Sequence, residues 1–175
     1  MKKIFLISLL FLNACANSGG TSTGNPLVAV QFKSFTPFHA SSVETQSVSN
    51  LKMCFKRLRF KPVSGLDDNI DLALDEVSIV DSGTLVTTVG VPAGTYSRVE
   101  FDLDTHCTSG RSVQLSNSNG SFTSTDTITI RFDGTLVLSA SQNLDLNIQA
   151  IVSALDTATS NADIKIKSES VSGSF

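Results

Sequence analysis

The fold is decided by a dense run of alternating apolar and basic residues, Leu51-Lys52-Met53-Cys54-Phe55-Lys56-Arg57-Leu58-Arg59-Phe60-Lys61-Pro62. The apolar residues from Leu51 to Phe55 share one parity, whereas Leu58 and Phe60 share the other. Alternation with a period of two is typical of a strand with one buried face. The change of parity indicates a β-bulge near Lys56, because a bulge inserts one residue and switches which positions face the core. We therefore expect one long, bent strand.

A second alternating stretch, residues 98–104, offers this strand a partner. Its apolar residues point one way and its charged residues the other; the latter are Arg98, Glu100, Asp102 and Asp104. Opposite charges that face each other across two strands stabilise a sheet. We therefore expect antiparallel pairing that sets residues 57–61 opposite residues 100–104, which also brings Cys54 towards Cys107.

The rest of the chain predicts more strands. The composition is rich in Ser, Thr, Val, Phe and Asp, contains 0 Trp, and suits short strands joined by polar turns. Asp133-Gly134 lies between two β-rich runs, a pattern that favours a two-residue hairpin. Residues 143–155 predict a core strand, with a helical end as an alternative, and residues 163–171 predict a last strand. The expected fold is an all-β, antiparallel sandwich formed by a single domain, residues 27–175.

The first residues of the chain predict an export signal. Met1-Lys2-Lys3 is followed by an apolar run that is too short to span a bilayer as a mature helix. The run ends in Leu12-Asn13-Ala14-Cys15, which resembles the lipobox of bacterial lipoproteins. The resemblance implies that residues 1–14 are a signal peptide and that Cys15 carries a diacylglycerol, with further acylation (for example by palmitate) of its amino group. The alternative is an ordinary cleavable signal followed by an incidental cysteine.

The lipobox resemblance also implies a location. In the lipoprotein family an aspartate after the cysteine favours retention in the inner membrane, and here the residue is Ala16. We therefore expect a lipid-anchored protein of the cell envelope, at the outer membrane if the cell has one. Residues 15–26 are rich in Gly, Ser, Thr and Asn and are predicted to be a flexible tether.

A turn motif supports the predicted sandwich. Val91-Pro92-Ala93-Gly94-Thr95-Tyr96 leads into the alternating stretch at residues 98–104. A turn of this kind in a chain with a lipobox resembles bacterial lipoprotein domains of unknown function with prealbumin-like or immunoglobulin-like sandwiches. The resemblance implies an architecture and transfers no catalytic residue.

The chain has three cysteines. With Cys15 assigned to lipid, Cys54 and Cys107 remain in a compartment where disulfides persist, and we predict a bridge between them. Two free, buried thiols are the alternative. His106 beside Cys107 raises the question of zinc, but adjacent residues of a strand face opposite sides, so the disulfide is favoured.

Three groups of residues are candidate sites. A basic face that is able to bind anionic glycans or lipid headgroups, or to pair with acids on a neighbouring strand, is formed by Lys52, Lys56, Arg57, Arg59 and Lys61. A weak candidate for calcium, without the glycine and glutamate of an EF-hand loop, is formed by Asp67, Asn69 and Asp71. A candidate for a pair of carboxylates with the separation used by glycosidases is formed by Asp102 and Asp104.

The sequence excludes some classes of function more firmly than it selects one. Removing Lys2 and Lys3 from the 13 basic residues leaves 11 against 16 acidic residues, a net charge of −5, which disfavours nucleic acid as a partner. The motifs of serine hydrolases, phosphate-binding loops and zinc proteases are absent from the sequence. We therefore expect no cofactor and a noncatalytic binding or adhesion module of the envelope. The alternatives are an assembly lipoprotein that binds another envelope protein, and a hydrolase with a pocket that gathers Asp67, Asp71 or His106.

Overall fold

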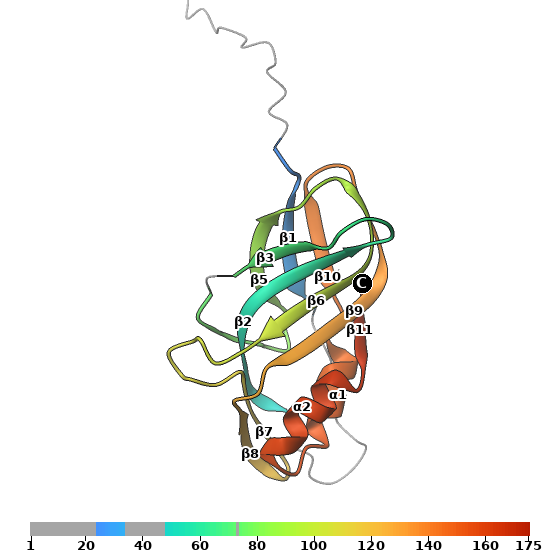
Figure 1. The fold of residues 1–175 in the computed structure, drawn as a ribbon. Coiled ribbons are helices and arrows are strands. Elements are labelled where there is room, and N and C mark those ends of the chain that lie inside the picture. The colour runs from blue at the N-terminus through green and yellow to red at the C-terminus, as the bar shows by residue number, and fades with distance from the viewer. Residues whose placement is uncertain (1–23, 34–47, 73) are drawn as a thin grey trace, which may run out of the picture.

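The computed structural model describes residues 24–33, 48–72 and 74–175. The predicted signal peptide and Cys15 lie outside the described residues, as does most of the predicted tether. The chain folds into a mostly β structure of two sheets, with two short helices near the C-terminus (Figure 1). None of the described helices has the length and hydropathy needed to cross a membrane.

The smaller sheet has three strands in the order β10-β1-β5. These strands are β10 (Gln142–Leu146), β1 (Leu27–Phe32) and β5 (Thr84–Gly90). Strand β1 is parallel to β10 and antiparallel to β5. The sheet is therefore mixed, and the prediction of a purely antiparallel fold is wrong, because the alternating pattern of β1 fixes which side chains are buried and not the direction of its neighbours.

The larger sheet is built around β2 (Ser49–Pro62), the longest strand. Its C-terminal half pairs with β3 (Asp68–Asp71) and β6 (Gly94–Leu103), and its N-terminal half pairs with β4 (Glu76–Ser78) and β7 (Val113–Asn117). The remaining strands are β8 (Gly120–Ser124), β9 (Ile128–Leu138) and β11 (Ser172–Ser174). Strand β8 pairs with β7, β9 with β6, and β11 in parallel with β9.

The predicted partner of β2 is confirmed, with a register that differs by two residues. Arg57 lies opposite Asp102 and Arg59 opposite Glu100, whereas the expected pairing placed Arg57 opposite Asp104. The register is interrupted between Phe55 and Arg57, which confirms the predicted bulge. A shift of two residues leaves every side chain on the same face, so the hydrophobic pattern does not distinguish the two registers.

The core lies between the two sheets. Phe32 of β1 reaches across to three phenylalanine rings of the larger sheet, with centroid distances of 6.1 Å to Phe55, 5.8 Å to Phe101 and 5.7 Å to Phe132. All four side chains are at most 1% exposed. Burial of an aromatic side chain of this size contributes roughly 1.5–3 kcal/mol, so this cluster is a major part of what holds the sheets together.

The C-terminal region corrects the sequence prediction. The expected strand at residues 163–171 is instead helix α2 (Asn161–Glu169), in which the Ser160 side chain caps the N-terminus by accepting a hydrogen bond from Asp163 N. Ile164 and Ser168, four residues apart, are buried, whereas Ile166 is exposed. A spacing of four places two side chains on the same face of a helix, so helix α2 buries only half of the apparently alternating apolar residues.

Two further expectations are corrected at the same end of the chain. The predicted core strand from residue 143 ends at Leu146 and gives way to α1 (Gln149–Asp156), the helical alternative for its end. The hairpin expected at Asp133-Gly134 is absent from the described structure, because β9 continues through it with a register irregularity. Gly134 is needed for a close approach instead, since a Cβ there would lie 2.6 Å from the carbonyl oxygen of Phe175.

Candidate functional site

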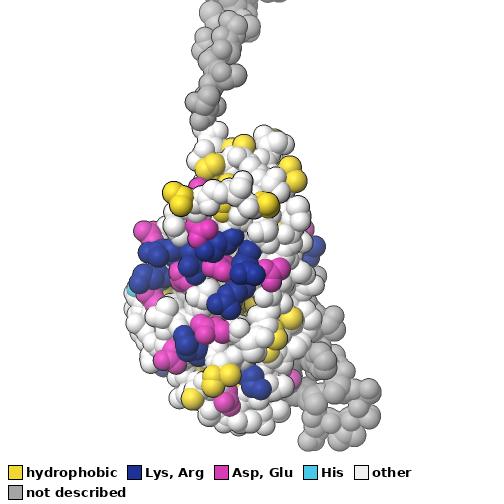
Figure 2. Space-filling model, turned by 45° about the vertical axis from the view of Figure 1, so that its right-hand side comes forward, with side chains coloured by type: hydrophobic (Ala, Val, Ile, Leu, Met, Phe, Trp, Pro, Cys, Tyr) yellow, Lys and Arg dark blue, Asp and Glu magenta, His cyan; other side chains and the backbone are white. Residues whose placement is uncertain are grey.

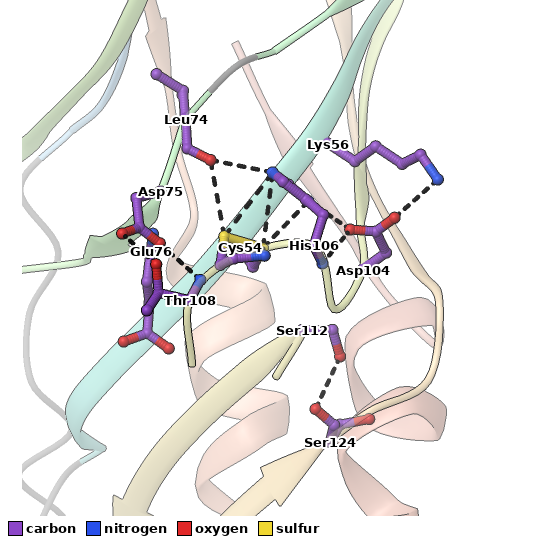
Figure 3. The surroundings of a disulfide bond; sticks show 11 residues. Cys54, Lys56, Leu74, Asp75, Glu76, Asp104, His106, Thr108, Ser112 and Ser124 are labelled. Atoms are coloured by element: carbon purple, nitrogen blue, oxygen red, sulfur yellow. Dashed lines mark hydrogen bonds and ion pairs between the residues drawn. A yellow bond between two sulfur atoms is a disulfide. The ribbon is translucent and has the colours of Figure 1, made fainter. Parts of the chain in front are cut away.

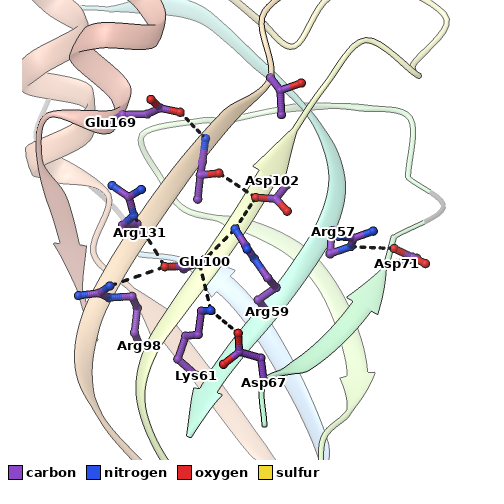
Figure 4. Close-up of polar contacts among 12 residues, drawn as sticks. Arg57, Arg59, Lys61, Asp67, Asp71, Arg98, Glu100, Asp102, Arg131 and Glu169 are labelled. Carbon is purple, nitrogen blue, oxygen red and sulfur yellow. Dashed lines mark hydrogen bonds and ion pairs between the residues drawn. The ribbon is translucent and has the colours of Figure 1, made fainter.

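The five basic residues predicted from β2 are all paired with acids, as Figure 4 shows for Arg57, Arg59 and Lys61 and Figure 3 for Lys56. Lysine and arginine side chains gather among acidic ones on one surface of the molecule (Figure 2). The pairs, with nitrogen-to-oxygen distances, are Lys52–Glu76 (3.4 Å), Lys56–Asp104 (2.7 Å), Arg57–Asp71 (3.0 Å), Arg59–Asp102 (2.6 Å) and Lys61–Asp67. The sequence left two alternatives for these residues, binding of an anionic ligand or pairing with acids on a neighbouring strand, and the structure shows the pairing with acids. We call this surface the charged face. It consists of these five pairs together with Arg98, Glu100, Arg131 and Asp133.

Glu100 is the centre of the charged face. Its side chain is only 7% exposed, and cations from three strands surround it (Figure 4). Their nitrogen atoms lie at the following distances from the Glu100 carboxylate: Arg59 3.1 Å, Arg98 3.7 Å, Arg131 3.7 Å and Lys61 3.9 Å. A buried carboxylate needs such compensation, because desolvation of an unpaired charge costs several kcal/mol.

Arg98 and Arg131 were not among the candidates from the sequence. Arg131 has the outward parity of β9, between buried Ile130 and Phe132, but its proximity to Glu100 depends on the order of strands β2, β6 and β9. Arg98 also donates a hydrogen bond from Nε to Asp133 Oδ1 at 2.6 Å. This bond lowers the pKa of Asp133 and raises that of Arg98.

The charges of this face are balanced. Seven basic residues pair with seven acidic residues, the additional members being Arg98, Arg131, Glu100 and Asp133. An anionic ligand would therefore have to displace carboxylates that already contact the cations. The arrangement explains the stability of the sheet more directly than it explains anion binding.

The weak calcium candidates lie along the same face. Asp71 and Asn69 of β3 are register partners of Arg57 and Arg59, and the carboxylate of Asp67 contacts Lys61. Calcium is bound by several oxygen ligands that converge on it. Here the two carboxylates point towards different cations, which leaves them poorly placed to share an ion.

The predicted disulfide between Cys54 and Cys107 is confirmed, with an Sγ–Sγ distance of 2.04 Å (Figure 3). It joins β2 to the loop that follows β6. The same loop is held by Asp75, whose carboxylate accepts hydrogen bonds from the backbone N–H groups of Glu76 and Thr108 at 2.8 and 3.2 Å. These backbone bonds lower the pKa of Asp75.

His106 lies against the disulfide. Its Nδ1 is 2.5 Å from Asp104 Oδ1 and 3.3 Å from Cys54 Sγ, and its Nε2 is 3.0 Å from the carbonyl oxygen of Leu74. Burial alone would raise the pKa of Asp104, but hydrogen bonds from Lys56 and His106 outweigh it and lower that pKa to about 2. Asp104 is thus a stably ionised link between Lys56 and His106.

This cluster contains the residues considered for zinc, and it includes His106, one of the three residues named for a hydrolase. Ligand atoms of Cys54, His106 and Cys107 lie within 4.8 Å of one another. A cysteine binds a metal ion or acts as a nucleophile only as a thiolate. Here the two sulfur atoms are bonded to each other, so neither is a thiolate. The oxidised protein therefore offers one imidazole at this point, already hydrogen-bonded on both nitrogens.

A shallow pocket of about 330 Å³ lies elsewhere, between the loop after β2 and the turn before β6. Its lining includes Val63, Leu66, Pro92 and Tyr96, and contains none of the three residues named for a hydrolase. The Tyr96 hydroxyl lies 2.8 Å from the carbonyl oxygen of Pro92 and 2.9 Å from Asp68 Oδ2. Burial and the neighbouring Asp68 carboxylate raise the pKa of Tyr96 to about 12, so its hydroxyl stays protonated and braces the turn.

The proposed glycosidase pair is also engaged in local contacts. Asp102 Oδ1 accepts hydrogen bonds from Arg59 Nη2 at 2.6 Å and from Thr129 Oγ1 at 2.8 Å, and Asp104 is held by Lys56 and His106.

In comparisons with known proteins, no family model, no curated protein and no solved structure matches the chain.

Proposed function

We propose that this protein is a bacterial lipoprotein, anchored through Cys15, whose β domain acts as a noncatalytic binding or adhesion module of the cell envelope. The observation that carries the proposal is the stretch Leu12-Asn13-Ala14-Cys15 behind a short apolar run. Two or more acyl chains hold a protein stably at a membrane. The outer membrane is the proposed location, because Ala16 follows the cysteine.

The contacts of the ionisable groups support a noncatalytic role. A general acid or base must reach a substrate, and the groups singled out for hydrolysis are bound within the domain: Asp67 to Lys61, Asp71 to Arg57, and His106 to Asp104. The balanced charges make a protein or glycan a better-suited partner than nucleic acid. No cofactor is part of the proposal.

We also propose that the two sheets form a prealbumin-like or immunoglobulin-like sandwich. The support is the turn before β6, where the buried hydroxyl of Tyr96 lies 2.8 Å from the carbonyl oxygen of Pro92. A tyrosine that bonds back to the backbone a few residues upstream is a feature of immunoglobulin-like sandwiches. A solved structure with a different strand connectivity would contradict this assignment.

The anchor is tested by Cys15→Ala in the full chain. The wild type should partition into the membrane fraction and incorporate labelled palmitate, and Cys15→Ala should lose both properties. Asn13→Ala is the matched control, because it changes the neighbouring position and leaves the acceptor thiol in place. A Cys15→Ala protein that still takes up palmitate and sediments with membranes contradicts the proposal.

The location is tested separately by Ala16→Asp. If sorting follows the rule of the lipoprotein family, this variant should move from the outer to the inner membrane while it keeps its palmitate label. Ala16→Ser is the control and should stay with the wild type. An Ala16→Asp protein that remains in the outer-membrane fraction contradicts the location and leaves the anchor intact.

A second candidate function, assembly with another envelope protein, is favoured by strand β5. This strand lies at an edge of the smaller sheet, carries no charged residue, and pairs with β1 alone among the described strands. Leu85 on it is 60% exposed. An uncharged edge strand is a template for pairing with a strand of another protein.

This second function is tested by photo-crosslinking in intact cells from position 85, with position 166 on α2 as the control site. A single protein adduct that forms from position 85 and not from position 166 favours assembly. Adducts that form equally from both positions, or from neither, count against the edge as an interface.

A further inference from the structure

One end of the molecule is formed by four segments without a charged residue. They are residues 24–27, 63–66, 91–95 and 135–141, and we call them together the uncharged tip. Hydrogen bonds place them side by side: Leu27 N donates to the side-chain Oγ of Ser141 at 2.9 Å, and Val63 N donates to the carbonyl oxygen of Thr95 at 2.9 Å. Because 17% of the residues in the chain are charged, an end that is formed by four uncharged segments differs from the rest of the surface.

The uncharged tip also exposes large apolar side chains. The exposed fractions are 92% for Leu66, 67% for Val63, 65% for Val137 and 55% for Leu27. Val63 and Val137 lie on either side of Thr95, which pairs with Val137 and accepts a hydrogen bond from Val63 N. These four are the majority of the exposed large apolar side chains in the described part of the chain, the others being Val80, Leu85 and Ile166.

The N-terminal segment joins the domain at this tip. Strand β1 starts at Leu27 beside the end of β5, and Pro26 accepts a hydrogen bond from Val91 N at 3.0 Å. Figure 2 shows lysine and arginine side chains gathered on the middle of the visible surface, with hydrophobic side chains at the end where β1 begins and others towards the opposite end. The helices α1 and α2 lie at the opposite end (Figure 1).

We propose that the uncharged tip rests on the lipid bilayer, with Leu66 and Val63 inserted among the headgroups. The inference rests on the proposed anchor at Cys15. A flexible coil of about ten residues, the length of the predicted tether, has a root-mean-square reach of roughly 16–19 Å. An acylated Cys15 would therefore hold the tip close to the membrane. Tethering makes the contact intramolecular, and a modest apolar surface is then sufficient for occupancy.

The chemistry of the tip favours a lipid surface over a protein. Its apolar side chains protrude from separate loops and strands, among Ser, Thr and Gly, as suits a soft and disordered partner. Its four segments contain no charged residue, and the two acids that follow Leu66 are engaged within the domain, Asp67 with Lys61 and Asp68 with the Tyr96 hydroxyl. Docking should therefore not require anionic lipid. Exposed large apolar side chains at the end facing a membrane lower their free energy by insertion at its interface.

The test uses the absence of tryptophan from the chain. A single Leu66→Trp substitution in the full-length, acylated protein supplies one fluorophore at the tip, and Val137→Trp supplies a second in case Leu66→Trp disturbs its loop. Ile166→Trp is the matched control, because Ile166 is 64% exposed on α2 at the far end. The proteins are bound to phosphatidylcholine vesicles with and without brominated acyl chains.

Both tip probes should emit at shorter wavelength on the vesicles and be quenched by brominated lipid at least threefold more than Ile166→Trp. Equal quenching at the tip and at position 166, on vesicles that carry the protein, overturns the docking and leaves the anchor standing. Failure of all three variants to float with vesicles overturns the anchor and the docking together. A blue shift that needs another envelope protein, without quenching by brominated lipid, assigns the tip to a protein partner instead.

Discussion

The charged face and the uncharged tip share two strands but differ in the contacts of their exposed side chains. Strands β6 and β9 contribute residues to both regions. On the charged face each basic side chain has an acidic partner within the domain, and Glu100 is almost fully covered by its cations. At the tip, Val63 and Leu66 extend into solvent. The comparison separates side chains that stabilise the fold from side chains that are available for an external contact.

The largest expected effect is at the centre of the charged face. Glu100→Ala leaves four cations around a buried position without their shared carboxylate, and loss of one partner of a buried ion pair costs about 3–5 kcal/mol. Chemical denaturation should show this decrease in the free energy of unfolding. The control is Asp71→Asn, which removes an acid that is 83% exposed beside Arg57 and should cost less than about 1 kcal/mol. Equal effects for the two variants would abolish the distinction between a buried centre and an exposed rim.

The next effect is that of the disulfide, which fastens the loop after β6 to β2. The two cysteines are separated by 53 residues, and a bridge that closes a loop of this kind stabilises by about 2–4 kcal/mol, chiefly by limiting the unfolded chain. The double variant Cys54→Ala/Cys107→Ala should lose that amount. Reduction of the wild type should lower its stability similarly and leave the double variant unchanged. A wild type whose two thiols react with an alkylating reagent after non-reducing denaturation contradicts the bridge.

A smaller, pH-dependent effect is expected at Asp104. Its pKa is lowered from 3.8 to about 2 in the folded protein. The folded state therefore stabilises the ionised carboxylate relative to the unfolded state. The resulting stabilisation, about 1–2 kcal/mol, is present above pH 4 and is lost as the pH falls towards 2. The difference in unfolding free energy between the wild type and Asp104→Asn should therefore shrink over this range. A difference that stays constant from pH 5 to pH 2 contradicts the assignment.

The charged face was partly predictable from the sequence, because its strands alternate clearly. Residues 51–62 and 98–104 were recognised as partners from parity and opposite charge. The register remained two residues out, since a shift of two keeps Val99 and Phe101 in the core. The position of Arg131 beside Glu100 was not predictable, because it depends on which strand flanks β6.

The C-terminal region was predicted less well for a different reason. Ile164 and Ile166 alternate with lysines over too few residues for their period to separate a strand from a helix. A helix signal was present in Ser160 and Asp163, because serine followed three residues later by an acid is typical of a helix N-terminus. The parallel pairing of β1 with β10 has no local signal at all, since it joins segments more than 100 residues apart.

The smallest expected effect is at the uncharged tip, and it is the result that separates the two regions most clearly. Leu66 is 92% exposed, so Leu66→Ser removes almost no contact within the domain, and surface substitutions of this kind change stability by at most about 0.5 kcal/mol. Thermal denaturation of Leu66→Ser and Val63→Ser should therefore overlay the wild type, in contrast to Glu100→Ala. A loss above about 1 kcal/mol in either tip variant would mean that these side chains pack within the protein. The two tip variants therefore test the proposed docking on a membrane without a change in the stability of the domain, whereas Glu100→Ala tests the stability itself.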